Sequence, residues 1–375
     1  MFVRLDQGLF QGPYSPAIEM ALETALHMHR GRAHILVMTP AEVLSLRQAT
    51  FLGIVARTVL EAIGQHASDY ASTERSVDRR LLLCRDDLPG VFEARTGGEI
   101  AVGLQWYTKR YSDGQASIFV ENVNSDADGI SYVLRCHGHM SRWPIQFVNM
   151  NFRHGGGSGV AAVLKALDPK DARGLCIVDR DCPDEVPPLK KGSTAHAAAG
   201  AATAAGWLEQ DGYGYSGKLP TFGFETTAGW SIENYVGPNA LRVYLNANHG
   251  TAATTNALRR AFPTFPTLSE IETWLWMRLN FKQPHLCSDA LRAAVKLRWR
   301  NDEVIERVCD RLGGIQMPGG TVHWCAENVV GGQFRRPLLE AFREDCKADQ
   351  YSEAYARLVG LIRTLLAGDV RMAQL

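Results

Sequence analysis

The chain of 375 residues carries 40 Lys+Arg and 40 Asp+Glu residues, so its formal net charge is zero. A hydrophobic content of 46% with 21% charged residues is ordinary for a globular protein, and the length suits one large domain or two. The balance of charges argues against strong non-specific coating of nucleic acid, although a local basic surface is compatible with net neutrality.

Eight cysteines are scattered along the chain, and none forms a Cys-x-x-Cys pair. There is no apolar run of about 18 residues and no signal-peptide pattern, so we expect a cytoplasmic protein with no membrane span and no disulfide framework. Cys136, His137 and His139 are close in sequence, as are His323 and Cys325. Neither group has a spacing that supplies four zinc ligands, so zinc is not expected.

Residues 1–110 predict an α/β portion in which no motif carries recognisable chemistry. His34–Met38 has the composition of a strand. Thr39 and Pro40 follow it as the cap and first residue of a helix, which the apolar spacing extends as far as Ile63. A further apolar run ends at Cys84. This portion could serve partner docking or substrate recognition.

Strand-like runs alternate with helical ones in the next part of the chain. Ala116–Val120 is β-rich and is followed immediately by Glu121. Pro144–Met150 predicts a second strand, the glycine-rich segment Gly155–Gly159 comes next, and Val160–Leu167 predicts a helix. Short strands that alternate with helices indicate a parallel sheet with right-handed crossovers, and therefore an α/β fold.

Gly174–Val178 predicts a short buried strand, and Asp179 and Asp181 follow its carboxyl end. Ligands of open α/β sheets bind outside the carboxyl ends of the strands. If this strand lies beside the one that precedes Glu121, all three acids share one edge of the sheet. Oxygen ligands favour Mg²⁺ or Mn²⁺, and a lone thiol at Cys182 does not change that preference. The alternative is that one of the aspartates caps a turn.

This order of strand–Glu, strand–glycine loop and strand–DxD resembles the TOPRIM fold of topoisomerases, primases and OLD-related nucleases. In that fold a Glu ends the first strand and a DxD ends the third. Thr226–Val236 resembles the "threonine … (Ser/Tyr)-Ile-Glu-Asn-Tyr" signature of a bacterial TOPRIM-like family that includes the nuclease subunit of the PARIS anti-phage system. The resemblance covers Ile118 to Val236.

The resemblance implies a TOPRIM-like catalytic domain over residues 111–238, with a parallel sheet flanked by helices. It implies a Mg²⁺- or Mn²⁺-dependent endonuclease in which Glu121, Asp179, Asp181 and Glu233 are catalytic. Glu121 would be a ligand or a general base, and the two aspartates would hold the metal. Glu233 would complete the acidic cluster or orient it, or else anchor a turn.

The chain departs from the family in its first motif, which usually has the form Val-Glu-Gly-x-x-Asp. Asn122 replaces the glycine, and the following acid is displaced by one residue to Asp126. Asp126 is therefore either a fourth metal ligand or, like Ser125, a cap of the helix that follows. Asp128 competes with Asp126 for the place in the metal site.

After residue 238 the pattern is mostly helical, and residues 239–375 predict a helical C-terminal domain. Arg292, Lys296 and Arg300 line one stripe of a predicted helix, which either contacts phosphates or is a solvated face. The Ala-rich run Thr194–Ala205 predicts either a short helix or a loop above the metal edge. Further helices are predicted over Ala240–Asn246, Leu268–Leu279, Asp289–Arg300, Asp302–Leu312 and Arg336–Leu366.

The resemblance therefore implies a metal-dependent nuclease in bacterial anti-phage defence, with DNA, RNA or tRNA as substrate. No Walker motif is present, so any ATP dependence would come from an ATPase partner protein. A homo-oligomer is compatible with the sequence. The alternatives are a nucleotide-sugar transferase that uses the DxD and a non-catalytic TOPRIM-like regulatory module. A dinucleotide site at Gly155–Gly159 is disfavoured, because Val160 occupies the last glycine position of GxGxxG.

Overall fold

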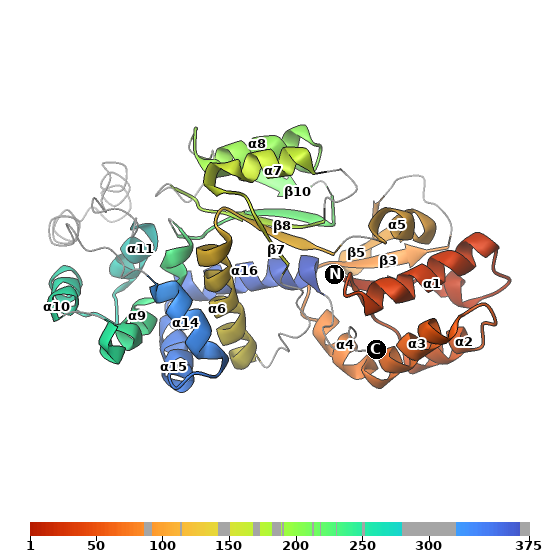
Figure 1. The fold of residues 1–375 in the computed structure, drawn as a ribbon, viewed down its shortest axis with the longest axis horizontal. Helices are drawn as coiled ribbons and strands as arrows, with labels where there is room; N and C mark the ends of the chain where they lie inside the picture. The colour runs from red at the N-terminus through yellow and green to blue at the C-terminus, as the bar shows by residue number, and fades with distance from the viewer. Residues whose placement is uncertain are drawn as a thin grey trace.

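The computed structural model describes residues 1–85, 92–112, 115–141, 151–167, 173–181, 189, 191–211, 214–217, 219–229, 231–249, 252–279 and 320–367. Three predicted features lie outside these residues: the Pro144–Met150 strand, the Asp302–Leu312 helix, and the Asp289–Arg300 helix with its basic stripe. Figure 1 shows an elongated arrangement, with the N-terminal elements at one end, a second sheet in the middle and C-terminal helices at the other end.

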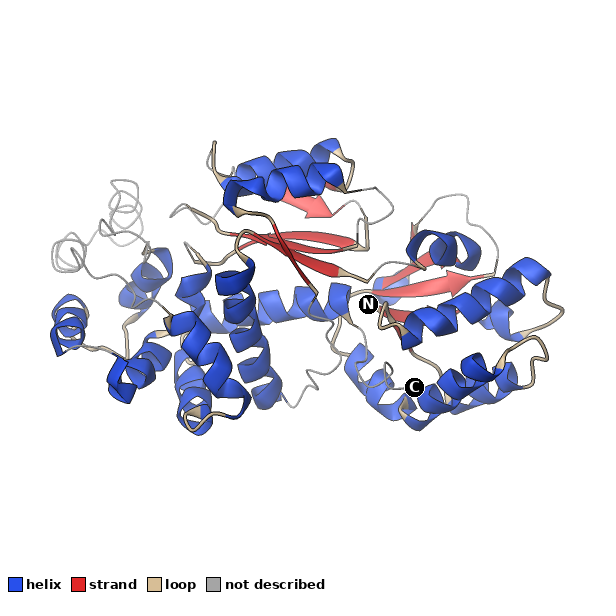
Figure 2. Ribbon diagram, viewed as in Figure 1, coloured by secondary structure: helices blue, strands red, loops and turns tan. Residues whose placement is uncertain are grey.

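The N-terminal unit is a mostly parallel sheet with helices packed against it (Figure 2). Its strands are ordered β2-β1-β3-β5-β4, and only β4 runs antiparallel to its neighbour. The predicted α/β character of this portion is confirmed. Its elements are β1 (Phe2–Leu5), α1 (Pro16–Arg30), β2 (Ile35–Leu36), α2 (Pro40–Arg47), α3 (Ile54–Gln65), α4 (Ala67–Glu74), β3 (Arg80–Cys84), β4 (Glu93–Ala94), β5 (Glu99–Gly103) and α5 (Leu104–Tyr111).

The predicted helix from Pro40 to Ile63 is divided in two in the structure. Its start is confirmed, because the Thr39 side chain accepts from the main-chain N–H of Glu42 in a reciprocal capping box. The first helix ends at Arg47, and α3 begins after Gly53. Both helices bury an apolar face, so the apolar spacing continues from α2 into α3. Periodicity alone therefore did not reveal the turn between Arg47 and Ile54.

The central sheet carries the acids that the sequence singles out. Its strands are all parallel and are ordered β11-β8-β6-β7. The predicted parallel sheet and the α/β class are therefore confirmed. The elements of this part are β6 (Ser117–Val120), α6 (Val123–Ser141), β7 (Phe152–His154), α7 (Val160–Ala166), β8 (Gly174–Val178), α8 (Thr194–Ala204), a hairpin of β9 (Leu208–Asp211) and β10 (Gly214–Gly217), and β11 (Phe222–Thr226).

Both faces of the central sheet are covered, as its continuously apolar strands require. In Figure 1, α7 and α8 lie over one face, and α6 and α16 (Asp349–Leu366) lie on the other. Alternate residues of β6 and β8 enter the two cores, because successive side chains of a strand point to opposite faces. The larger core takes Ile118, Val120, Leu175 and Ile177, and the smaller takes Phe119, Cys176 and Val178.

The chain after β11 is helical within the described residues, as predicted. The expected long helix from Arg336 to Leu366 is interrupted after Asp345, and α16 begins at Asp349. Within the described residues, no helix is both long enough and apolar enough to cross a membrane. The elements are η6 (Ile232–Tyr235), α9 (Pro238–Tyr244), a π-helical turn (Leu245–His249), α10 (Ala252–Ala261), α11 (Glu270–Arg278), α14 (Thr321–Gly331), α15 (Arg335–Asp345) and α16.

Gly174 is the first residue of β8, and only glycine fits there. Both its backbone conformation and the space beside it exclude a side chain. Its φ is 142°, and a Cβ there would lie 1.9 Å from the main-chain oxygen of Ser117 on β6. The close approach is what lets β6 and β8 start their pairing in register.

We expect Gly174→Ala to destabilise the protein by about 2–5 kcal/mol, because backbone strain and overpacking add. Gly200→Ala is the matched control. Gly200 lies within α8 with no atom within 4 Å of the new Cβ, so alanine there should stabilise by about 0.5–1 kcal/mol. Urea unfolding of the two variants measures both effects. Equal stabilities would contradict the account.

Candidate active site

Glu121 and Asp179 meet at the carboxyl edge of the central sheet. Glu121 follows β6 directly, and Asp179 follows β8, its parallel neighbour. The main-chain N–H of Asp179 donates to Oε1 of Glu121 at 3.0 Å. The predicted adjacency of these two acids is therefore confirmed. The bond fixes one oxygen of the Glu121 carboxylate.

The Asp179 carboxylate is held from the opposite side by the segment after β11. Its Oδ1 accepts from the main-chain N–H of Ile232 at 3.0 Å. The side chain of Asp179 is only 5% exposed, so a main-chain donor there offsets part of the cost of burying its charge. Sequence patterns did not indicate this contact, because any residue type can supply a main-chain N–H.

Asn234 holds that segment in place. Its amide nitrogen donates to the main-chain oxygens of Trp276 and Leu279, and its Oδ1 accepts from the N–H of Ser231. Asn234 is fully buried, so these bonds satisfy groups that would otherwise be costly to desolvate. The hydrogen bonds of Asn234 in the Ile-Glu-Asn-Tyr motif thus hold this segment where the N–H of Ile232 donates to Asp179.

Tyr235 fixes the preceding turn. Its hydroxyl accepts from the N–H of Ala228, and its own main-chain oxygen accepts from the hydroxyl of Tyr355 on α16. Tyr235 therefore connects the segment that follows β11 with α16.

Thr227 and Arg180 join the ends of β8 and β11. The N–H of Arg180 donates to Oγ1 of Thr227, and Nε of Arg180 donates to the Thr227 oxygen, both at 3.1 Å. Thr227 in turn donates its hydroxyl to Gly229. The Arg180 side chain is thus directed toward the end of β11.

Asp181 lies two residues beyond Asp179 in a left-handed conformation, with φ of 55°. Non-glycine residues adopt this region at a cost, and Asp is one of the types that tolerate it best. Gly156 and Gly157 also have positive φ, of 68° and 65°, and the N–H of Gly157 donates to the main-chain oxygen of Glu121. The glycine loop is therefore a tight turn against the acidic edge.

Asp126 belongs to the start of α6, and its carboxylate contacts the residue that directly follows Glu121. The helix begins at Val123, so Asp126 lies in its first turn. Its Oδ2 accepts from the N–H of Asn122, and its Oδ1 accepts from the hydroxyl of Ser125. Asn122 is the capping residue, because its Oδ1 accepts from the N–H of Asn124. At 5% exposure, Asp126 has the contacts of a helix-capping group.

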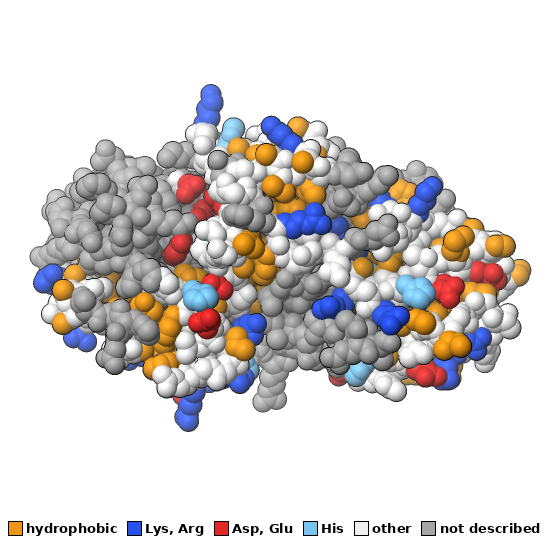
Figure 3. All heavy atoms as spheres, viewed as in Figure 1, with side chains coloured by type: hydrophobic (Ala, Val, Ile, Leu, Met, Phe, Trp, Pro, Cys, Tyr) orange, Lys and Arg blue, Asp and Glu red, His pale blue; other side chains and the backbone are white. Residues whose placement is uncertain are grey.

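Asp128, the competing acid, pairs with a histidine of α14. Its Oδ2 lies 2.7 Å from Nδ1 of His323, whose Nε2 lies 3.2 Å from Glu327. The hydrogen bond and charge of Asp128 raise the pKa of the His323 imidazole. Figure 3 shows acidic side chains beside a histidine on this face of the molecule, over α6 and α14. Asp128 is thus held in an exposed ion-pair cluster.

Glu233 is placed by η6 one residue after Ile232, and its side chain is half-buried. The N–H of Ile232 donates to Asp179, and Glu233 is the next residue in the chain, so this hydrogen bond brings the backbone of Glu233 near the acidic edge. This position is compatible with both roles expected for it, completing the acidic cluster or anchoring the turn.

The donor set of this edge fits a hard divalent cation. Mg²⁺ is commonly held by one or two carboxylates, with water or substrate oxygens completing its shell. Glu121 and Asp179 would supply the protein oxygens. No group of three or more His, Cys, Asp or Glu residues with metal-site geometry is present in the part of the chain that the structure describes. The hydrogen bond from the Asp179 N–H brings Glu121 and Asp179 together, and Asp181 follows two residues later.

Among the described cysteines, Cys176 on β8 lies close to Glu121. Burial, followed by the charge of Glu121, raises the pKa of the Cys176 thiol well above its usual range. The thiolate is the reactive form, so Cys176 is an inert part of the smaller core.

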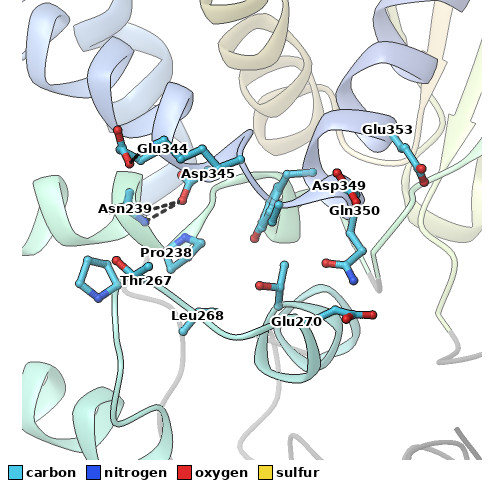
Figure 4. Close-up of a pocket in the computed structure, with 15 residues that line it drawn as sticks. Pro238, Asn239, Thr267, Leu268, Glu270, Glu344, Asp345, Asp349, Gln350 and Glu353 are labelled. Atoms are coloured by element: carbon cyan, nitrogen blue, oxygen red, sulfur yellow. Dashed lines mark hydrogen bonds and ion pairs between the residues drawn. The ribbon is translucent and has the colours of Figure 1, made fainter. Parts of the chain in front are cut away.

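A separate cavity of about 630 Å³ lies between α9, α11 and the junction of α15 with α16. Figure 4 shows Asn239 bonded to Asp345 at one end and Asp349, Gln350 and Glu353 at the other. Its described lining holds five carboxylates and one lysine: Glu270, Glu344, Asp345, Asp349, Glu353 and Lys347. This excess of acidic side chains disfavours the binding of phosphates. The candidate substrate site is therefore not this cavity.

No family model, no curated protein and no solved structure matches this chain.

Asp345 should make the stability of the protein depend on pH. Burial raises its pKa from 3.8 to about 7, partly opposed by bonds from Asn239 and Ala240. The folded state therefore binds a proton that the unfolded state releases between about pH 4 and pH 7. Stability from this group is present at pH 4 and is lost as the pH rises to 7, by up to about 1.4 kcal/mol per pH unit.

Unfolding of the wild type and of Asp345→Asn from pH 4.5 to 8 measures this loss. The difference between the two curves isolates Asp345 from other titrating groups. Asp349→Asn, in the same cavity but exposed, should follow the wild type. Parallel curves for all three proteins would show that Asp345 is already ionised at pH 5.

Proposed function

We propose that the protein is a metal-dependent nuclease that hydrolyses phosphodiester bonds of DNA or RNA, with a TOPRIM-like central domain. The observation that carries the proposal is the contact of Asp179 N–H with Glu121, which holds two carboxylates together at the carboxyl edge of a parallel sheet. The strand order β11-β8-β6-β7 and the Asp-Arg-Asp and Ile-Glu-Asn-Tyr motifs support the finer assignment.

In this proposal the side chains have distinct tasks. A bound Mg²⁺ or Mn²⁺ would stabilise charge on the phosphoryl group and acidify a water. Glu121 and Asp179 would hold it, and each has one oxygen oriented by a main-chain N–H. Glu121 is alternatively the general base, with a carboxylate oxygen that takes the proton of the attacking water. Asp181 adds a third acid to this edge. Glu233, the residue after Ile232, orients the acidic cluster.

Two observations favour the nuclease over its alternatives. A nucleotide-sugar transferase needs the DxD but has no use for a strand-ending glutamate in contact with it. A non-catalytic module would retain acids at neighbouring strand ends at a cost in stability, because nearby like charges disfavour each other unless a cation or a proton is present.

Asp179→Asn should abolish divalent-cation-dependent cleavage, with a loss of at least about 100-fold, while the protein stays folded. Asparagine keeps an oxygen for the Ile232 N–H but loses the negative charge. Asp181→Ala should cause a comparable loss. The assay is incubation with Mg²⁺ or Mn²⁺ and labelled DNA, total RNA and tRNA. Glu61→Gln, which removes an exposed acid paired with Arg47, is the control and should cleave normally.

Metal binding provides a second measurement in the same experiment. Mn²⁺ at a hundredfold excess over its dissociation constant should stabilise the folded protein by about 2.7 kcal/mol, and Glu121→Gln should lose this stabilisation. Cleavage by an Asp179→Asn/Asp181→Ala double variant with unchanged melting would refute the site. An unchanged melting curve of the wild type at millimolar Mn²⁺ would refute the proposed binding of a metal ion.

The biological setting we propose is bacterial anti-phage defence, with an ATPase partner that controls the nuclease. The motif resemblance and the absence of a Walker motif support this setting. Expression of wild type in a bacterial host, with its neighbouring genes, should reduce phage plating or slow growth, and Asp179→Ala should not. If both forms give equal growth and equal plating, with and without those genes, a housekeeping role in repair or RNA processing is the better account.

A further inference from the structure

The outer face of α15 carries a local excess of positive charge. Arg335, Leu339 and Arg343 follow one another at intervals of four residues, so they form one stripe of the helix. Leu338 and Phe342, on the face of the helix next to this stripe, are buried. A surface depression of about 480 Å³ is lined by this stripe and its neighbours: Gly332, Gln333, Arg335, Arg336, Leu339, Glu340 and Arg343. We call this set the arginine surface.

The charges of the arginine surface are not neutralised by its own acids. Arg336 forms an ion pair with Glu340 at 2.9 Å. Within the described residues, Arg335 and Arg343 form no ion pair. The arginine surface is therefore a concentrated positive site on a neutral protein.

His139, at the end of α6, adds a hydrogen-bond acceptor for one of these arginines. Nη2 of Arg335 lies 2.8 Å from Nε2 of His139. Burial and the charges of Arg335 and Arg343 lower the pKa of His139. A neutral imidazole can accept from the guanidinium and orient it, which leaves the remaining guanidinium donors of Arg335 to face outward.

We propose that the arginine surface binds the phosphodiester backbone of the nucleic acid whose scissile phosphate lies at the Glu121–Asp179 edge. This inference rests on the proposed function. Guanidinium forks match phosphate oxygens, and neutralising phosphates releases counterions. An exposed pair of arginines above a shallow depression fits a flexible polyanion better than an enclosed small ligand.

The geometry of α6 sets the length of nucleic acid that can use both sites. The helix begins two residues after Glu121 and reaches His139 sixteen residues later, which is about 24 Å at 1.5 Å per residue. At 3.4 Å per base pair this corresponds to about 7 base pairs. Oligonucleotides shorter than this should bind one site only.

The test is binding of a fluorescently labelled 20-mer, followed by anisotropy in EDTA, so that cleavage does not interfere. An Arg335→Gln/Arg343→Gln variant should bind about 10-fold to 100-fold more weakly than wild type. The slope of log affinity against log salt should become shallower by about 2, one unit for each lost phosphate contact. Arg47→Gln removes an exposed arginine of α2 as the matched control and should leave both quantities unchanged.

Two further measurements separate this inference from protein stability and from the proposed function. Arg335→Lys/Arg343→Lys keeps the charges and should retain most of the binding, which shows that charge and not folding is responsible. In cleavage assays the glutamine variant should raise KM for the 20-mer with little change in kcat, and a 5-mer should show no difference.

Unchanged affinity and salt slope in the glutamine variant would overturn the inference, even if cleavage still requires Asp179. Failure of wild type to bind the 20-mer would overturn it as well. Equal binding of poly-glutamate would indicate an acidic protein partner and would also count against a nucleic-acid surface. Loss of the Asp179 requirement for cleavage, in contrast, would refute the proposed function while leaving the binding result intact.

Discussion

The parallel pairing of β6 with β8 is the constraint on which the candidate site depends. It brings the ends of two strands that are far apart in sequence to one edge, where the N–H of Asp179 bonds to Glu121. Each carboxylate then has one oxygen fixed by a main-chain donor and its charge next to another charge. These main-chain N–H groups offset part of the cost of burying the two carboxylates.

The C-terminal helices contribute to this edge although none of their side chains was expected to. Asn234 bonds to main-chain oxygens at the end of α11, and Tyr355 of α16 bonds to Tyr235. Through these contacts the helices hold Ile232 against Asp179. The predicted division into a catalytic sheet and a separate helical domain therefore understates their dependence, since the helices and the sheet share one buried core.

The sequence predicted those parts of the site that depend on strand pattern and residue type. Strand-ending acids and the glycine turn both have local signals, and each lies where its signal placed it. The helix-capping role of Asp126 was one of its two expected roles, although Asn122 opens α6 earlier than the pattern suggested. The Ile232 contact had no such signal, because it depends on a main-chain group whose position only tertiary structure determines.

Net neutrality conceals a separation of charge along α15. Its outer stripe carries Arg335 and Arg343, whereas its last turn directs Glu344 and Asp345 into the acidic cavity. In the proposed mode of binding, a polyanion would be attracted to the first and repelled from the second, although the whole chain has no net charge. Because Coulomb interactions fall off within about 10 Å at moderate salt, local grouping of charge governs binding more than the total does.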